Sequence, residues 1–303
     1  MRKIFYALFT LFLLTSCNDG DVIEVELDFE QDLSLCEEST SSYLVYEIKE
    51  QPYESLSLLF PKNATTALIF NPTENNYTQT LTINGSTIRF NYRTYNGNPE
   101  DLFCSLIPNP NVDIINDYES PSGTVTTLTT FTDDDGDGIP SEVEDENLDG
   151  DNNPATNPTD RDGDGIPDYK DADDDNDNIP TRFENHNYSE ENGLSEAQDT
   201  DGDGTPDYLD EEDDGDDVLT RYEDEDGDSN PMDDFDLSSE TPDVPRYLDN
   251  TAMETFAGGE LTTNTYTRNF IVRFKLNNLD LRILSTDVIE LGTYRYSLPR
   301  EGE

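Results

Sequence analysis

Acidic residues recur at a fixed spacing between residues 133 and 223. Five copies of one phrase, Asp-x-Asp-Gly-Asp-Gly-Ile-Pro and its close relatives, begin at Asp133, Asp160, Asp173, Asp199 and Glu212, and are numbered copies 1 to 5 below. Each copy has carboxylates at positions 1, 3 and 5 and a further acidic residue at position 12. Oxygen ligands at alternate positions, closed by a later carboxylate, are what a hard divalent cation such as Ca2+ requires. The spacing therefore predicts several Ca2+ sites along this segment.

A turn at position 6 has to fold these carboxylates towards one point. Glycine or asparagine occupies that position in four of the five copies, and both residues tolerate positive φ at little cost. The carbonyl group of position 7 can then join the ligand shell. The predicted ligands of the five copies are Asp133, Asp135, Asp137, Ile139 and Glu144; Asp160, Asp162, Asp164, Ile166 and Asp171; Asp173, Asp175, Asp177, Ile179 and Glu184; Asp199, Asp201, Asp203, Thr205 and Asp210; and Glu212, Asp214, Asp216, Val218 and Glu223.

The distance between copies excludes one familiar calcium architecture. Successive copies start 27, 13, 26 and 13 residues apart, by subtraction of their start positions. An EF-hand needs a helix on each side of its loop, and two copies 13 residues apart leave no room for one. Pro140, Pro167, Pro180 and Pro206 also stand where an exit helix would begin, and each disfavours helix in the residue before it. The copies are therefore not EF-hands.

The alternation of short and long units resembles the thrombospondin type 3 repeat over residues 133–249. The long units carry Asn147-Leu-Asp149-Gly-Asp151-Asn-Asn-Pro154 and Asp224-Glu-Asp226-Gly-Asp228-Ser-Asn-Pro231, which are similar to that family's Asn-Pro units and add Asp149, Asp151, Asp226 and Asp228 as predicted ligands. The resemblance implies an irregular chain wrapped around a row of calcium ions, and a role in adhesion. The animal proteins link these units with cysteines, whereas this segment has none. The path of the wrap therefore stays open.

The charge of this segment bears on the alternative, an acidic disordered tail. Residues 133–249 hold 45 acidic and 5 basic residues, so 40 of the 53 net negative charges of the chain lie there. Long acidic runs are usually solvated. A segment with so few apolar residues cannot become compact against its own repulsion without counter-ions. Because a random tail has no reason to keep position 12 acidic, we expect cations to take the place of an apolar core.

The first residues have the pattern of a secretion signal. Arg2 and Lys3 precede a short apolar run, Ile4–Leu14, which is too short to span a bilayer. The sequence Leu14-Thr-Ser-Cys17 resembles a bacterial lipobox, which implies cleavage before Cys17 and lipid on its thiol. An ordinary signal peptide is the alternative. The resemblance implies an outer-membrane lipid anchor in the cell envelope. The acidic tether Asn-Asp-Gly-Asp after Cys17 and the supply of calcium outside the cell favour display at the cell surface, with the periplasmic face as the other option.

Residues 21–131 have the pattern of an antiparallel β-sandwich. Apolar and acidic residues alternate in Asp21–Glu30, and Tyr43–Lys49, Ser55–Phe60 and Val125–Phe131 are further predicted strands. Asn84-Gly85 between two apolar runs predicts a hairpin. With Cys17 lipidated, Cys36 and Cys104 remain as an even pair in an oxidising compartment, which predicts one disulfide; two free buried thiols are the alternative.

Strand patterns return after the repeats. Alternation over 270–276, then Leu281 and Ile283, then Val288–Tyr296, predicts about three strands, which are too few for a stable separate domain. We therefore expect 251–303 to join the sheet begun earlier, with the repeats inserted; a small C-terminal module packed on the repeats is the alternative. The predicted organisation is a signal at 1–16, a tether at 17–22, a β-domain at 23–131, repeats at 132–250 and completing strands at 251–303.

The sequence predicts no catalytic site. The only histidine, His186, lies in a polar stretch where a solvated side chain is expected, and no nucleophile elbow, zincin helix or phosphate loop occurs. The acidic charge excludes nucleic acid as a partner. The leading hypothesis is a non-enzymatic, calcium-stiffened surface lipoprotein that acts as a spacer or adhesin, with a surface protein or glycan as partner. The alternative is a lipoprotein whose tyrosine-rich β-domain captures glycans or another nutrient, and an extracellular hydrolase is the weakest.

Overall fold

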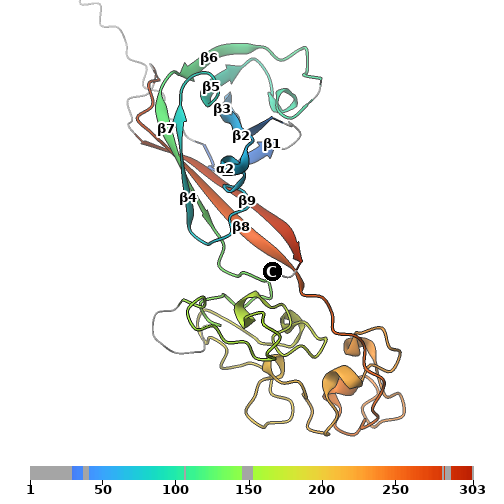
Figure 1. Ribbon diagram of the computed structural model, residues 1–303. Helices are drawn as coiled ribbons and strands as arrows, with labels where there is room; N and C mark the ends of the chain where they lie inside the picture. Colours follow the sequence, from blue (N-terminus) through green and yellow to red (C-terminus); the bar gives the residue numbers. More distant parts are fainter. Residues whose placement is uncertain are drawn as a thin grey trace, which may run out of the picture. The chain divides into compact units, whose positions relative to one another are not determined.

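The computed structural model describes residues 29–36, 41–105, 107–144, 153–281, 283 and 288–301. The fold is mainly β, with two antiparallel sheets and a long irregular segment between the strands (Figure 1). This confirms the predicted fold class of a β-sandwich interrupted by an array with little regular secondary structure. The chain divides into two compact units, one formed from Met1–Lys62, Thr80–Thr126 and Lys275–Gly292, the other from Asn63–Gln79, Thr127–Phe274 and Thr293–Glu303.

The five-stranded sheet lies in the first unit. Its strands are, in sheet order, β1 (Ser34–Cys36), β2 (Ser42–Glu50), β3 (Tyr53–Pro61), β5 (Arg89–Tyr95) and β6 (Ile114–Ser120). Val45, Leu58, Phe60 and Phe90 are completely buried on one face. They place aromatic and branched side chains on the pleated surface, where such residues pack well. The predicted strands at 43–49 and 55–60 are present, whereas β1 and β6 were not foreseen.

The disulfide prediction is confirmed. Cys36 at the end of β1 is bonded to Cys104, which follows the short 3-10 helix η2 (Glu100–Leu102). The rings of Tyr46 and Phe103 stack beside it with centroids 4.5 Å apart. The bond links residues 68 positions apart in the sequence. A crosslink of that span stabilises the fold by roughly 4 kcal/mol through the entropy that it removes from the unfolded chain.

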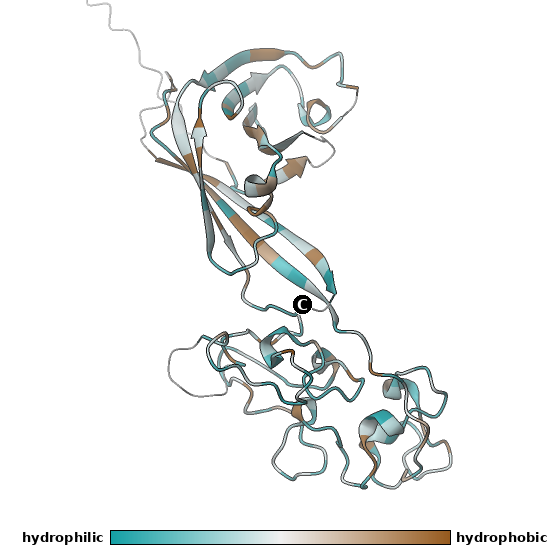
Figure 2. Cartoon of the chain, in the orientation of Figure 1, coloured by the Kyte–Doolittle hydropathy of each residue, from teal (hydrophilic) through white to brown (hydrophobic). Residues whose placement is uncertain are grey.

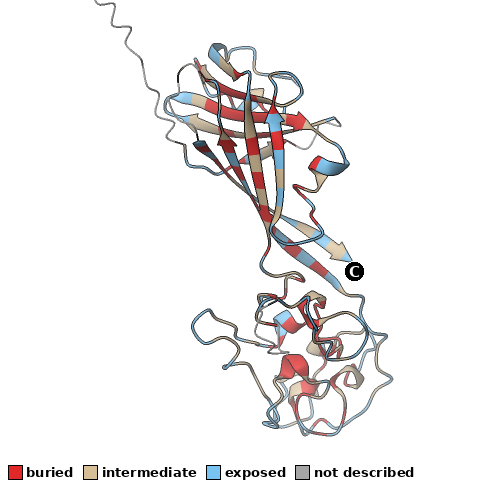
Figure 3. Cartoon of the chain, turned by 60° about the vertical axis from the view of Figure 1, so that its left-hand side comes forward, coloured by how far each residue is buried: buried red, intermediate tan, exposed pale blue. Residues whose placement is uncertain are grey.

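The four-stranded sheet contains strands from both sides of the repeats. Its order is β4 (Tyr77–Ile83), β7 (Gly123–Thr130), β8 (Thr265–Asn277) and β9 (Val288–Glu301). Buried and exposed residues alternate along β8, as Figure 3 shows, and the alternation predicted for 270–276 is confirmed. Strands β8 and β9 therefore extend a sheet whose other strands precede the repeats. This strand order is the one expected if the repeats are inserted between β7 and β8.

The predicted Asn84-Gly85 hairpin is wrong. Strand β4 belongs to the four-stranded sheet and β5 to the five-stranded one, so the two do not pair. The Oδ1 atom of Asn84 instead accepts hydrogen bonds from the backbone N–H groups of Ser86, Thr87 and Ile88, at 3.0, 2.9 and 3.1 Å. These bonds close the loop on itself, so that it carries the chain from one sheet to the other.

Three further expectations differ from the structure. Leu281 and Ile283 lie in no strand, and neither do Phe29 and Glu30, the described end of the strand predicted at 21–30. The rest of that strand, together with Cys17, lies outside the described residues. A single helical turn, α2 (Ala64–Ala67), was not foreseen; Asn63 caps it by accepting hydrogen bonds from the backbone of Thr65 and Thr66.

The repeats fold without strands of their own over 133–144 and 153–250. Their regular elements are one-turn 3-10 helices: η3 (Asp168–Lys170), η4 (Thr181–Phe183), η5 (Asp207–Leu209), η6 (Thr220–Tyr222), η7 (Pro231–Asp233) and η8 (Arg246–Leu248). Figure 2 shows few hydrophobic residues along this segment. One small apolar cluster is formed by Ile139, Tyr208 and Leu209 with Val143, Tyr188, Leu194 and Ala197 packed against it.

Candidate metal centre

Each copy closes into a loop through its own aspartates. The carboxylate at position 3 accepts a hydrogen bond from the backbone N–H of position 5, and position 5 accepts one from position 7. In copy 3 these bonds run from Asp177 N to Asp175 Oδ1, 3.3 Å, and from Ile179 N to Asp177 Oδ1, 2.6 Å. Each bond uses one oxygen of its carboxylate, so the other oxygen remains available inside the loop.

The expected turn at position 6 is present in all five copies. The five φ values are positive: 107° for Gly138, 101° for Gly165, 78° for Asn178, 104° for Gly204 and 73° for Asp217. Position 9 closes each loop a second time, because its N–H bonds to the carbonyl just before the copy. These five bonds are Ser141 to Thr132, Asp168 to Thr159, Thr181 to Ala172, Asp207 to Gln198 and Thr220 to Glu211, at 2.9 to 3.2 Å. The closure returns position 12 towards positions 1, 3 and 5.

Burial separates the copies into two classes. Copies 1, 3 and 5 enclose their ligands: Asp135, Asp175 and Asp214 are 0, 1 and 3% exposed. Copies 2 and 4 are more open to solvent: Asp164, Asp201 and Asp203 are exposed and Asp162 is half-buried, although Asp171 at position 12 of copy 2 is buried. The additional predicted ligands Asp226 and Asp228 are exposed, and Asp149 and Asp151 lie outside the described residues. The strongest candidate metal sites are therefore the three odd-numbered copies.

The buried carboxylates in these copies have oxygens without a hydrogen-bond partner. Both oxygens of Glu144, Asp173 and Glu184 are buried and unpartnered, and so is one oxygen of each of Asp135, Asp137, Asp175, Asp177, Asp214, Asp216 and Glu223. A buried polar atom normally has a partner, since leaving one without costs about 1–3 kcal/mol and more when it is charged. The donor set is oxygen only, which suits a hard divalent cation.

Groups of these oxygens are close enough to share one ion. Oxygens of Asp133, Asp135 and Asp137 lie within 4.8 Å of one another, and the same holds for Asp173, Asp175 and Asp177. In copy 2, the exposed Asp160 and Asp164 form a similar group with the half-buried Asp162. The structure thus brings together the ligands predicted at positions 1, 3 and 5 of copies 1, 2 and 3. It also shows Ile139 and Ile179, predicted as carbonyl ligands, with side chains that are completely buried.

Burial shifts the pKa values of these carboxyl groups upwards. Desolvation raises the pKa of Asp137 to about 7, and the nearby charge of Asp133 adds to that shift. Desolvation raises the pKa of Glu223 to about 9, helped by the charges of Asp214, Asp216 and Glu212. Without a cation, the buried carboxylates therefore tend to take up protons. A bound divalent ion would compete with those protons for the same oxygens.

Two carboxylates of the buried sites belong to a different copy. Oxygens of Asp137, Glu144 and Asp174 lie within 4.8 Å of one another, and so do those of Asp177, Glu184 and Asp213. Asp174 and Asp213 occupy position 2 of copies 3 and 5, which was not among the predicted ligands. Both are 2% exposed, with unpartnered oxygens. We refer to these two groups as the cross-copy sites, because the first joins copy 1 to copy 3 and the second joins copy 3 to copy 5.

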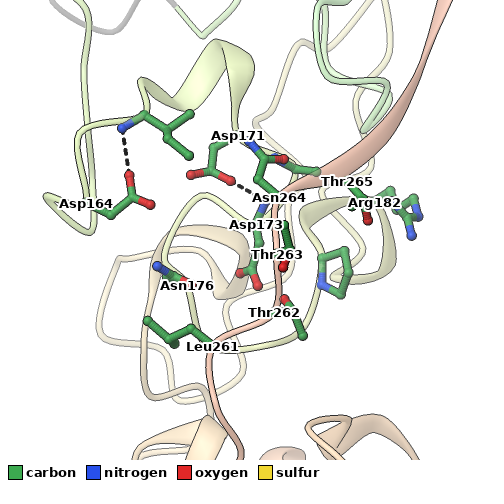
Figure 4. A pocket seen from close by; sticks show the side chains of 13 residues that line it. Asp164, Asp171, Asp173, Asn176, Arg182, Leu261, Thr262, Thr263, Asn264 and Thr265 are labelled. Carbon is green, nitrogen blue, oxygen red and sulfur yellow. Dashed lines mark hydrogen bonds between the residues drawn. The ribbon is translucent and has the colours of Figure 1, made fainter. Parts of the chain in front are cut away.

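An extended segment that leads into β8 binds the array through asparagine side chains. Asn264 donates to the carbonyl of Lys170, 2.9 Å, and accepts from the N–H of Ala172, 3.2 Å; Thr262 N donates to Asn178 Oδ1, 2.9 Å. A cavity of about 330 Å3 lies between this segment and the acidic residues, and Figure 4 shows Asp164, Asp171, Asp173 and Asn176 lining it opposite Thr262 to Thr265.

His186 is half-buried against copy 1, not fully solvated as expected. A side chain on Gly138 would approach its Nε2 atom to 3.3 Å, and its Nδ1 atom accepts a hydrogen bond from Tyr188 N, 3.1 Å. Burial lowers the pKa of His186, so the neutral form is favoured. The histidine fills space between copy 1 and the loop that follows copy 3.

Comparison with known proteins finds a match within the array alone. Residues 134–198 match the model of the BamM C-terminal family, a match that begins inside copy 1 and ends after copy 3. No curated protein and no solved structure shows significant similarity to the chain. In the part of the chain that the structure describes, no helix is both long enough and apolar enough to cross a membrane.

Proposed function

We propose that residues 133–249 bind several Ca2+ ions, and that these ions take the place of an apolar core. The observation that supports this most is the set of buried carboxylate oxygens without partners in copies 1, 3 and 5. Unpaired buried charges are costly, whereas the same oxygens directed at one divalent ion stabilise the fold. Backbone hydrogen bonds close each loop around these oxygens, so that one ion can reach all of them.

The donor chemistry favours calcium over other divalent ions. The groups of oxygens named above, all within the described residues, consist of aspartate and glutamate carboxylates and include neither histidine nor cysteine. Mg2+ demands a small octahedral shell and keeps its waters, whereas Ca2+ accepts six to eight oxygens in irregular shells. Loops that offer three to five carboxylates from two parts of the chain suit the larger ion.

For the biological role, we propose a non-enzymatic lipoprotein in which the calcium-loaded array is a stiff arm for the β-domain, used in adhesion or spacing. The lipid anchor at Cys17 and the outer-membrane location rest on the lipobox resemblance. The rival role of glycan capture needs exposed aromatic rings. Among the tyrosines of the β-domain, Tyr92 and Tyr95 are only 2 and 6% exposed, whereas Tyr53 is 37% exposed, so few of these rings are available to a glycan.

The test is a calorimetric calcium titration of the chain from residue 18 onwards after chelation. We expect saturable binding at roughly 10⁻⁴–10⁻³ M or tighter, with Mg2+ a poor substitute. Asp177→Asn should reduce the number of bound ions and weaken binding by about tenfold or more, because Asp177 belongs to two groups of oxygens. Asp203→Asn, at an exposed position of copy 4, is the matched control and should affect at most one weak site.

Absence of binding at 10-fold higher calcium, roughly 10⁻² M, would reject the proposal. Equal effects of the two substitutions would leave calcium binding in place but would remove the distinction between buried and exposed copies.

A further inference from the structure

Three of the 3-10 turns that follow a proline in the array share a tyrosine at their second position. The three 3-10 turns η3, η5 and η8 follow Pro167, Pro206 and Pro245 and have the sequences Asp168-Tyr-Lys, Asp207-Tyr-Leu and Arg246-Tyr-Leu. The same two backbone bonds close each turn: Lys170 to Pro167 and Asp171 to Asp168; Leu209 to Pro206 and Asp210 to Asp207; Leu248 to Pro245 and Asp249 to Arg246. The three turns are therefore structurally equivalent.

The third turn differs from the other two in the residue that lies six positions after the first residue of the turn. After Asp168 it is Asp174, and after Asp207 it is Asp213, the two residues that complete the cross-copy sites. After Arg246 it is Ala252, which is completely buried. The third turn thus stands where a further cross-copy site next to copy 5 would be built. Both acidic residues of that pattern are missing from it.

Arg246 supplies a positive charge at this position. It is 6% exposed, and its guanidinium forms ion pairs with Glu225, 3.0 Å, and Glu254, 3.1 Å. Its Cζ atom lies 5.0 Å from the centroid of the Phe256 ring. Its charge also opposes the rise in the pKa of Glu223, the closing ligand of copy 5. A protein cation therefore neutralises acidic residues here, where the two earlier turns contribute a carboxylate.

The other end of the array has a matching arrangement. Asp134 is position 2 of copy 1, the counterpart of Asp174 and Asp213, but no earlier copy exists for it to join. Its carboxylate forms an ion pair with Arg268 of β8, 3.2 Å. Arg268 is 2% exposed and lies 4.8 and 5.6 Å from the rings of Phe131 and Tyr266. The guanidinium also donates to the backbone carbonyl of Asp134.

We propose that Arg268 and Arg246 are permanent cations that terminate the row of cross-copy calcium sites at its two ends. The inference rests on the proposed calcium binding and adds to it a rule for where the row stops. The number of cross-copy sites is then determined by which residues begin and follow these three turns. Arg268 also binds the first copy to strand β8 through Asp134.

The test rebuilds the missing site. Arg246→Asp combined with Ala252→Asp restores the two acids found at 168 and 174 and at 207 and 213. Native mass spectrometry of the calcium-loaded chain should count one more Ca2+ than in the wild type. Arg246→Asn combined with Ala252→Asn is the matched uncharged control and should not gain an ion. A doubly acidic variant that keeps wild-type circular dichroism but gains no ion would overturn the proposal.

A second variant decides the matter if the first does not fold. Asp207→Arg combined with Asp213→Ala transfers the Arg246/Ala252 pair to the preceding turn, where it should terminate the row early. We expect the loss of one ion with the array still compact in calcium, whereas Asp207→Ala combined with Asp213→Ala should lose the ion and compactness together. Equal behaviour of these two variants would contradict the role of the arginine. If the wild type bound no calcium at all, the proposed function itself would fail, and that outcome is distinct from both.

Discussion

Chelation of calcium at pH 8 is expected to expand residues 133–249 while both β-sheets remain folded. At that pH, 45 acidic residues face 5 basic ones in this segment, and the buried carboxylates would lose the partners that calcium supplies. Each unpaired buried charge costs several kcal/mol, so the few apolar contacts around Ile139 cannot hold the array together. Small-angle scattering should show a larger radius of gyration after chelation, with cleavage by protease confined to the array.

The stability of the calcium-free array is expected to fall as the pH rises. Desolvation, together with the charges of Asp177 and Asp207, raises the pKa of Asp213 to about 10. Desolvation also raises the pKa of Asp171 to about 7. Because these folded-state values exceed the unfolded ones, protonation stabilises the folded array. That stabilisation is complete below about pH 4 and is lost as the pH rises through 7 to 10.

The chelated chain should therefore be compact at pH 4 and expanded at pH 8, whereas calcium affinity should change in the opposite direction. Glu54, on β3 outside the array, provides a control: Glu54→Gln should alter neither transition. An unchanged radius of the chelated chain between pH 4 and pH 8 would contradict the idea that repulsion among buried carboxylates opens the array.

Deletion of β8 and β9 is expected to have the second large effect. These strands form half of the four-stranded sheet, so a chain that ends at residue 264 would leave the edge of β7 unpaired. It would also uncover the buried face that Phe270, Val272 and Phe274 provide. Exposed apolar edges of this kind associate with one another. Size-exclusion chromatography should show aggregation.

Removal of the array, by contrast, should be tolerated. Gly136 lies directly against Thr267 of β8, since a Cβ atom there would come within 2.3 Å of the Thr267 carbonyl oxygen. A short Gly-Ser linker from Gly136 to Thr265 can therefore replace residues 137–264 and retain the Asp134–Arg268 ion pair. We expect a soluble product with one cooperative melting transition that no longer depends on calcium. If this product aggregated as well, the array would be part of the β-domain and not an insertion.

The parts of the site that could be predicted from the sequence are those whose ligands lie close together along the chain. Positions 1, 3 and 5 lie within one loop, so the spacing of Asp173, Asp175 and Asp177 was sufficient to predict that their oxygens meet. Asp174 and Asp213 escaped prediction because their partners are in another copy, 29 to 37 residues earlier, and the spacing of the copies does not reveal which of them share a site. A signal does exist: copies 1, 3 and 5 have Asp at position 2 and Ser or Thr at position 9, as in Asp174 with Thr181, whereas copies 2 and 4 have Asp at position 9, as in Thr200 with Asp207.

The sheets show the same division. The two-residue alternation of β8 predicted a half-buried strand correctly, because alternation is a property of the strand itself. The Asn84-Gly85 turn was misassigned, because a turn sequence specifies the bend but not the partner of the strand that follows. Strand β5 finds its partners in β3 and β6, with Leu58 opposite Phe90 and Tyr92 opposite Tyr118.

The most direct test of the account is an anomalous difference map from crystals of the chain grown in calcium, measured at a wavelength where calcium scatters anomalously. We expect peaks enclosed by the carboxylates of copies 1, 3 and 5, including density that Asp174 shares with Asp137 and Glu144 and that Asp213 shares with Asp177 and Glu184. We expect no such peak beside Ala252. Ordered crystals with these carboxylates in place and no anomalous density among them would contradict it.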